Sequence, residues 1–144
     1  NIDTLDQIIN RLKSKYQMIY NRPLTTLIFT DNCEILDLKE HAWLRNTHPD
    51  VILMDDLYED YKKSVNNFNH LQLMVYANCN RFISAHGGTA AFASYFGGIN
   101  IILSKKGIEH DLNEFTTIIP ALSGAKIFHA KEESEIFKHI EDHY

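Results

Sequence analysis

The fold of this chain is decided by residues 82–103, which read FISAHGGTAAFASYFGGINIIL. An apolar run is followed by two glycines, a segment of small residues, two further glycines and a second apolar run. We interpret this order as a buried strand, a tight turn, a short helix that stops at Gly97-Gly98, and a second buried strand. Such a βαβ unit is typical of α/β folds with parallel strands.

The turn after the first of these strands favours an anion site. Gly87 and Gly88 lack the Cβ atoms that keep a ligand off the backbone, and Thr89 can cap the next helix and offer a hydroxyl. The helix expected at about residues 89–96 would direct unpaired N–H groups and its positive dipole end at a phosphate. His86 adds a further donor. The alternative is a plain tight turn with a capping threonine and a partly buried histidine.

Length and composition predict a single globular domain over residues 1–144. The chain is 44% hydrophobic and 23% charged, which is ordinary for a protein with a core. The formal net charge is −5 and there is no long basic run, so we expect no nucleic-acid partner. A local basic pocket for a phosphorylated small molecule remains compatible with this charge.

The cysteines and the apolar runs bear on the compartment. Cys33 and Cys79 form neither a metal-type pair nor a disulfide framework, and we expect reduced thiols. No run approaches the roughly 18 apolar residues of a membrane span, and charged residues interrupt the first twenty positions, so a signal peptide is not expected. These features favour a cytoplasmic location without a transmembrane segment. Because the chain begins at Asn1 and its first methionine is Met18, we expect a piece of a longer polypeptide.

Apolar periodicity and turn residues predict alternating helices and strands along the chain. Helices are expected from residue 2 to the turn residues 21–23 and at 38–45, 68–79, 89–96, 112–122 and 132–143. Strands are expected at 24–30, 51–54, 81–85, 100–103 and 125–129. Asp3 or Thr4 is the expected cap of the first helix. Residues 55–67 are expected to form a polar crossover.

This alternation predicts an α/β fold, a Rossmann-like three-layer domain with a mainly parallel sheet of about five strands. Ligands of such sheets bind beyond the carboxyl ends of the strands. Four turns are expected to meet at that edge, formed by residues 30–32, 55–56, 86–89 and 104–107.

The order strand, His86-Gly87-Gly88-Thr89, small-residue helix, Gly97-Gly98 and apolar strand resembles the donor-binding half of GT-B glycosyltransferases. Residues 72–79 and 93–98 also look like those of glycosyltransferases that build polysaccharides. The resemblance covers residues 24–144 as architecture and about residues 70–105 as motif.

The resemblance implies roles for individual residues. The turn residues that would contact the diphosphate of a nucleotide sugar are His86, Gly87, Gly88 and Thr89. Ser94 stands where many family members carry a glutamate that reaches the ribose, and Asn100 stands where a proline is common. Lys105 or Glu109, in the loop after the second strand, would lie near the sugar or the nucleoside.

The implied function is transfer of a sugar from a nucleotide sugar to a glycan acceptor, with no cofactor besides the donor substrate. The general base would come from an acceptor domain that precedes this chain, since the residues here offer no convincing base. Two alternatives stay open: a non-catalytic Rossmann-like module that binds a nucleotide or phosphometabolite, and an enzyme similar to polysaccharide pyruvyl transferases.

Metal chemistry is a weaker interpretation of the sequence. Asp55 and Asp56, with Glu59 and Asp60, have the ligand type for a divalent cation, but a solvated helix start is the more common explanation of such a cluster. The eight histidines show no zinc-type spacing. We therefore expect no metal site.

Overall fold

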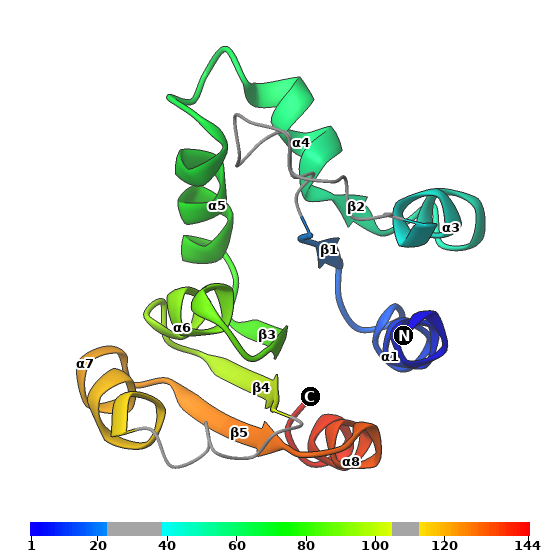
Figure 1. Cartoon of the computed structure of the whole chain (residues 1–144). Coiled ribbons are helices and arrows are strands. Elements are labelled where there is room, and N and C mark those ends of the chain that lie inside the picture. The colour runs from blue at the N-terminus through cyan, green and yellow to red at the C-terminus, as the bar shows by residue number, and fades with distance from the viewer. Residues whose placement is uncertain (23–38, 105–112) are drawn as a thin grey trace. The chain divides into compact units, whose positions relative to one another are not determined.

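The computed structural model describes residues 1–22, 39–104 and 113–144 of the chain. It is an α/β protein with parallel strands, as the sequence predicts (Figure 1). The described strands form one sheet of two strands and one of three. The predicted strand at 24–30 and the turn that follows it lie outside the described residues. Among the helices that the structure describes, none has the length and apolar character needed to cross a membrane.

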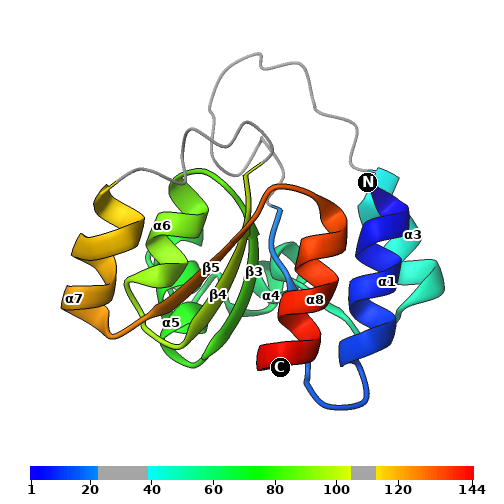
Figure 2. The same ribbon diagram turned by 90° about the horizontal axis from the view of Figure 1, so that it is seen from below.

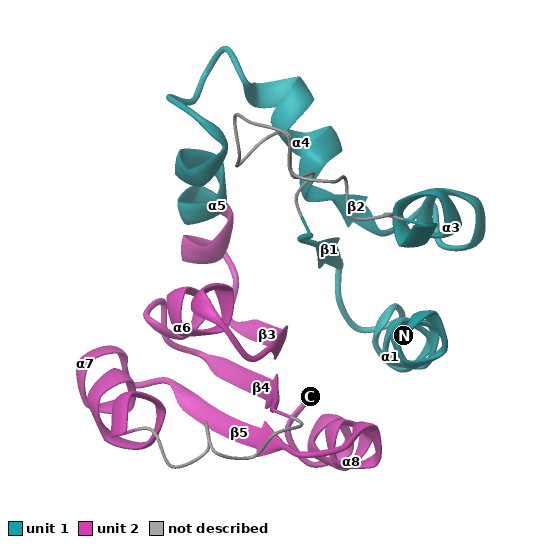
Figure 3. Cartoon of the chain, viewed as in Figure 1, with its two compact units in different colours: residues 1–74 teal, residues 75–144 magenta. Residues whose placement is uncertain are grey.

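The chain divides into two compact units, Asn1–Met74 and Val75–Tyr144 (Figure 3). The boundary falls within one helix, α5 (Phe68–Ala77). The single domain expected over residues 1–144 stays a prediction. Each unit contains one of the two sheets and is described on its own.

Unit 1 combines short parallel strands with helices. Its remaining elements are α1 (Ile2–Leu12), β1 (Ile19–Tyr20), α3 (Lys39–Thr47), β2 (Ile52–Leu53) and α4 (Met54–Tyr61). Tyr20 pairs with Leu53 in the parallel β1–β2 ladder. A core of Ile9, Leu44 and Leu53 joins α1 and α3 to β2.

The predicted cap of the first helix is wrong. The cap of α1 is Asn1, whose side-chain oxygen accepts a hydrogen bond from the backbone N–H of Asp3 at 3.1 Å. Asp3 is therefore already inside the first turn, where its negative charge suits the helix dipole. The helix also ends at Leu12, well before its predicted end at residues 21–23, and β1 lies in the part that was expected to be helical.

The strand expected at 51–54 is shorter than predicted, because Met54 already begins α4. The expected crossover at 55–67 accordingly contains most of this helix. Asp55 and Asp56 lie in its first turn, where acidic side chains favour a helix start. The two-residue strand β1 was not predicted, since its apolar content is too short to stand out.

Unit 2 follows the sequence prediction closely. Its elements after α5 are β3 (Arg81–Ala85), α6 (Gly88–Ser94), β4 (Ile99–Leu103), η2 (Glu114–Ile118), α7 (Ile119–Ser123), β5 (Lys126–Ala130) and α8 (Glu133–His143). The helix expected at 112–122 is a π-helical turn that continues into α7. Pro120 lies in the first turn of α7, where proline is tolerated.

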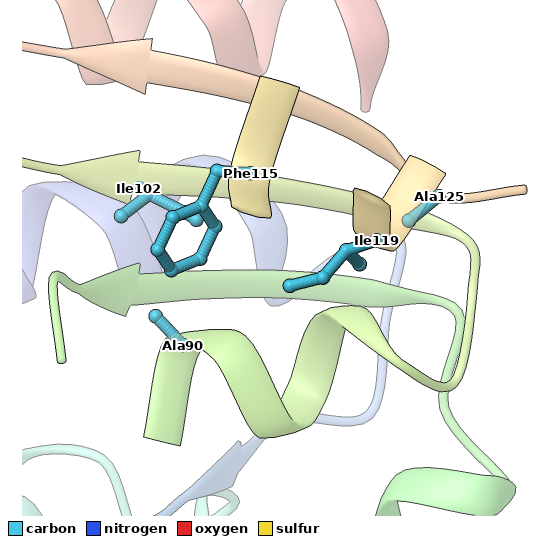
Figure 4. Close-up of a cluster of buried hydrophobic side chains, with 5 residues drawn as sticks. All are labelled: Ala90, Ile102, Phe115, Ile119 and Ala125. Carbon is cyan, nitrogen blue, oxygen red and sulfur yellow. The ribbon is translucent and has the colours of Figure 1, made fainter. Parts of the chain in front are cut away.

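The sheet of unit 2 is parallel, with strand order β3-β4-β5. Helix α6 lies on one face of this sheet together with η2 and α7, and α8 lies on the other face (Figure 2). On the first face the buried side chains form one apolar cluster (Figure 4), which consists of Ala90, Ile102, Phe115, Ile119 and Ala125.

Gly98 fixes the connection between α6 and β4. Its φ is +73°, and a Cβ atom at this position would lie 2.4 Å from the carbonyl oxygen of Asn80. Only glycine, which has no Cβ atom, fits at position 98 without a clash with this carbonyl group. The predicted glycine stop after the small-residue helix is therefore confirmed, and the close approach gives its physical reason.

Candidate functional site

The turn after β3 is built around Gly87. Its φ of +149° is favourable only for glycine, and it serves as the N-cap residue of α6 without a side-chain capping bond. The helix begins at Gly88, so the predicted capping role of Thr89 is wrong. Thr89 is instead an exposed residue in the first turn of the helix.

The backbone of this turn leaves donors open. The N–H groups of Ala90 and Ala91 both donate to the carbonyl oxygen of Gly87, at 3.0 and 3.2 Å. The N–H groups of Gly88 and Thr89 have no acceptor among the described residues. Among the described residues, and leaving aside the chain neighbours and the helix's own backbone, no heavy atom lies within 4 Å of a Cβ built at Gly87 or Gly88. A ligand atom can therefore approach the backbone of the turn closely.

His86 connects the turn to the neighbouring strand. Its backbone N–H donates to the carbonyl oxygen of Leu103 at 2.9 Å, at the end of β4. Its imidazole ring lies 5.3 Å from the ring of Phe115 in η2. The Nε2 atom is buried and has no hydrogen-bond partner among the described residues. The ring is therefore held by packing at the carboxyl end of β3.

The ends of β4 and β5 complete this edge of the sheet. The backbone N–H of Ser104 donates to the carbonyl oxygen of Ala130 at 2.8 Å, so the pairing continues one residue beyond β4. His129 in β5 meets Phe115 edge to face, at 5.9 Å between ring centroids. His86 and His129 thus contact the same phenyl ring. His129 was not predicted as a site residue, although its place at the end of a predicted strand could have indicated it.

Ser94, expected near the ribose, lies inside the protein. Its side chain is fully buried, with 0% relative exposure. Its hydroxyl donates to the carbonyl oxygen of Ala90 at 2.8 Å and accepts from Nδ2 of Asn100 at the same distance. The structure therefore places His86, Gly87, Gly88 and Thr89 at one edge of the sheet, whereas the side chain of Ser94 is buried between α6 and β4.

Lys105 and Glu109 lie outside the described residues. Their expected place near the sugar or the nucleoside stays a prediction. The same holds for the loop that joins β4 to η2.

The acidic cluster of unit 1 has protein partners. The buried carboxylate of Asp55 lies 3.3 Å from Nδ1 of His41, and Asp56 accepts a hydrogen bond from Arg45 at 2.7 Å. Within residues 1–22, 39–104 and 113–144, no three His, Cys, Asp or Glu side chains are grouped so that they could hold a metal ion. Asp56 therefore forms an ion pair between helices α3 and α4, and Asp55 lies against His41 between the same two helices.

Comparison of the chain with protein-family models, with curated proteins and with solved structures found no match. The resemblance to glycosyltransferases therefore depends on the turn and its flanking strands.

Proposed function

We propose that the turn at residues 86–89 binds the diphosphate of a nucleotide sugar, and that the chain is the donor-binding part of a glycosyltransferase. The observation that supports this most strongly is the backbone at Gly87 and Gly88. At this helix start the N–H groups of Gly88 and Thr89 have no acceptor among the described residues, and none of those residues fills the space at Gly87 and Gly88. Oxygen atoms of a phosphate group suit such donors.

Sugar transfer needs charge stabilisation at this position. The bond between the anomeric carbon and the diphosphate oxygen breaks, and its electron pair remains on the diphosphate. The acceptor hydroxyl forms the new bond to the anomeric carbon and gives its proton to a general base. Donors that are already oriented toward the leaving diphosphate stabilise this charge as it develops. We propose this role for the N–H groups of Gly88 and Thr89 and for the imidazole of His86.

The remaining parts of the proposal extend beyond the turn. Lys105 and Glu109 are kept as contacts to the sugar or the nucleoside, whereas Ser94 is left out because its side chain is fully buried. The proposed architecture is a Rossmann-like, three-layer domain with a sheet of about five strands. The proposed partners are a glycan acceptor and a separate acceptor domain that supplies the general base. The proposed location of the protein is the cytoplasm.

Substitution of Gly88 tests the proposal. Gly88 has no positive φ and a Cβ atom meets nothing there, so Gly88→Val is expected to fold. The valine would block close approach to the backbone, and we expect it to abolish binding of UDP, GDP and their sugar conjugates in calorimetric titration. His86→Ala is expected to weaken binding by roughly 1.5–3 kcal/mol, the scale of a hydrogen bond to a charged group.

The matched control is Tyr95→Val, which places a valine at the other end of α6, where the side chain is exposed. It should bind the nucleotide as the unaltered protein does. If the unaltered chain binds one of these nucleotides and both Gly88→Val and His86→Ala bind it equally well, the diphosphate does not bind at this turn. If the chain binds the nucleotide sugar but transfers no sugar to an acceptor when the acceptor domain is present, the non-catalytic alternative is favoured.

A further inference from the structure

A buried polar network lies beneath the turn, where β3, β4 and α6 meet. Its centre is Asn100 in β4, which has 0% relative exposure. Its Nδ2 atom donates to the carbonyl oxygen of Ala90 at 3.1 Å and to the hydroxyl of Ser94 at 2.8 Å. Its Oδ1 atom accepts from the hydroxyl of Ser84 in β3 at 3.1 Å. Both N–H groups and the oxygen of the Asn100 side-chain amide therefore form hydrogen bonds.

The network continues from the end of α6 to the end of α7. The hydroxyl of Ser123, at the end of α7, donates to the carbonyl oxygen of Ser94 at 2.9 Å and to that of Ile119 at 2.8 Å. It also accepts from the backbone N–H of Ala125 at 3.2 Å, just before β5. Helix α6 is thus held at its first full turn by Asn100 and at its last residue by Ser123.

This attachment restricts the motion that matters for the turn. Apolar packing of Ala90 against Ile102 and Phe115 resists separation of α6 from the sheet, but such contacts are non-directional. Hydrogen bonds are directional and resist sliding and rotation of the helix. The carbonyl oxygen that Asn100 holds belongs to Ala90, the residue directly after Thr89. Sliding of α6 would displace the open N–H groups of Gly88 and Thr89 by the same amount.

We infer that Asn100 is a positioning residue, which through Ala90 and Ser94 fixes the turn at residues 86–89 for its ligand. This inference rests on the proposed function of that turn. Ser94 and Asn100 occupy the two positions where the chain departs from the glycosyltransferase pattern, and they bind each other. The two residues that differ from the pattern thus belong to one polar network, in which the buried Ser94 accepts a hydrogen bond from Asn100.

Asn100→Leu tests the inference, because leucine has a similar size and makes no hydrogen bond. We expect the variant to bind inorganic pyrophosphate and UDP about tenfold to a hundredfold more weakly, the loss of about one hydrogen bond to a charged group. In the free protein, the amide NMR signals of Gly88 and Thr89 are expected to shift. Ser94→Ala is a milder second variant, which removes the hydroxyl that accepts a hydrogen bond from Asn100. It tests the positioning role if Asn100→Leu does not fold.

Tyr144→Phe is the matched control. The hydroxyl of Tyr144 donates to the carbonyl oxygens of Phe82 and Ile99, at 2.6 and 3.3 Å, in the same unit. Its removal also costs part-buried hydrogen bonds, but at the ends of β3 and β4 that lie away from the turn. We expect unchanged affinity and unshifted amide signals of Gly88 and Thr89, which separates positioning from a general loss of stability.

The outcomes distinguish the inference from the proposed function. If the unaltered chain binds neither pyrophosphate nor UDP, the proposed function is wrong and the positioning role is lost with it. If the unaltered chain binds and a folded Asn100→Leu or Ser94→Ala variant binds within about twofold of it, less than any full hydrogen bond contributes, only the positioning role is wrong.

Discussion

Tyr20 ends β1 in unit 1, where its ring meets that of His41 edge to face at 5.8 Å. Its hydroxyl donates to Oε1 of the buried Glu40 at 3.4 Å, and Arg22 forms an ion pair with the same carboxylate. Burial, followed by the negative charge of Glu40, raises the pKa of Tyr20 from 10.0 to about 12. A tyrosine at a strand end is therefore held in its neutral form by its surroundings.

This raised pKa predicts a loss of stability at high pH. The folded state holds the phenolic proton more tightly than the unfolded state, so the contribution is fully present below pH 10 and is lost as the pH rises toward about 12. We expect a late step in the phenolate absorbance titration, after most of the seven tyrosines have ionised. Tyr20→Phe should remove that step and flatten the free energy of unfolding between pH 10 and 12. An unchanged titration curve in Tyr20→Phe would contradict the assignment.

At the scale of elements, the connection between α6 and β4 depends on one glycine. Alanine at Gly98 would need a left-handed backbone and would press its Cβ against the Asn80 carbonyl. We expect Gly98→Ala to lower the free energy of unfolding by roughly 2 kcal/mol or more, since the left-handed conformation alone costs an L-residue about 1–2 kcal/mol. Urea denaturation measures this change.

Gly88→Ala is the control for this prediction. It makes the same chemical change at a position with no positive φ and free space around the new methyl group. We expect its free energy of unfolding to stay within about 0.5 kcal/mol of the unaltered protein, as for most exposed substitutions. Equal losses in both variants would mean that the close approach to Asn80 does not constrain the fold.

The elements of unit 2 could be predicted because their signals are local. The apolar run at 99–103 is covered on both faces of a parallel sheet, and the glycines at 97 and 98 end the helix before it. Of the two short strands of unit 1, β2 was predicted within the apolar run at 51–54, whereas β1 could not be predicted, since a two-residue strand carries no periodicity. The acidic start of α4 was read as a crossover because charge alone does not separate a helix from a polar loop.

The sequence could predict the backbone turn of the candidate site, but not the contacts of the side chains around it. Two glycines after a strand predict the turn, but the hydrogen bond between Ser94 and Asn100 joins residues from a helix and a strand. Only packing determines which side chains are buried, so the sequence could not show that Ser94 faces inward. His129 was missed for the same reason, because its contact with Phe115 joins residues from two different elements.

At the scale of the whole molecule, the two sheets differ in how well their backbones are protected. β4 is paired on both sides, and Asn100, Ile101 and Ile102 are fully buried. β1 and β2 are two residues long and form a single ladder in the described part of the chain. Hydrogen exchange follows local opening, which is easiest where few bonds must break.

We therefore expect the slowest amide exchange at β4 and faster exchange at β1 and β2. Hydrogen exchange followed by NMR or by mass spectrometry of peptides measures both regions in one sample. Equal protection of the two sheets would show that they open in a single cooperative step, contrary to this prediction.

The strand order of unit 2 also bears on how the chain acquires its structure during synthesis. The sheet order β3-β4-β5 equals the order along the chain, so each strand pairs with the one made directly before it. Pairing of neighbours in sequence closes shorter loops than pairing of distant strands would, and so costs less chain entropy. The exception is Tyr144, whose hydroxyl reaches back 62 residues to Phe82. The three strands can pair once residue 130 has been added, whereas the hydrogen bond from Tyr144 to Phe82 forms only after α8 has been made.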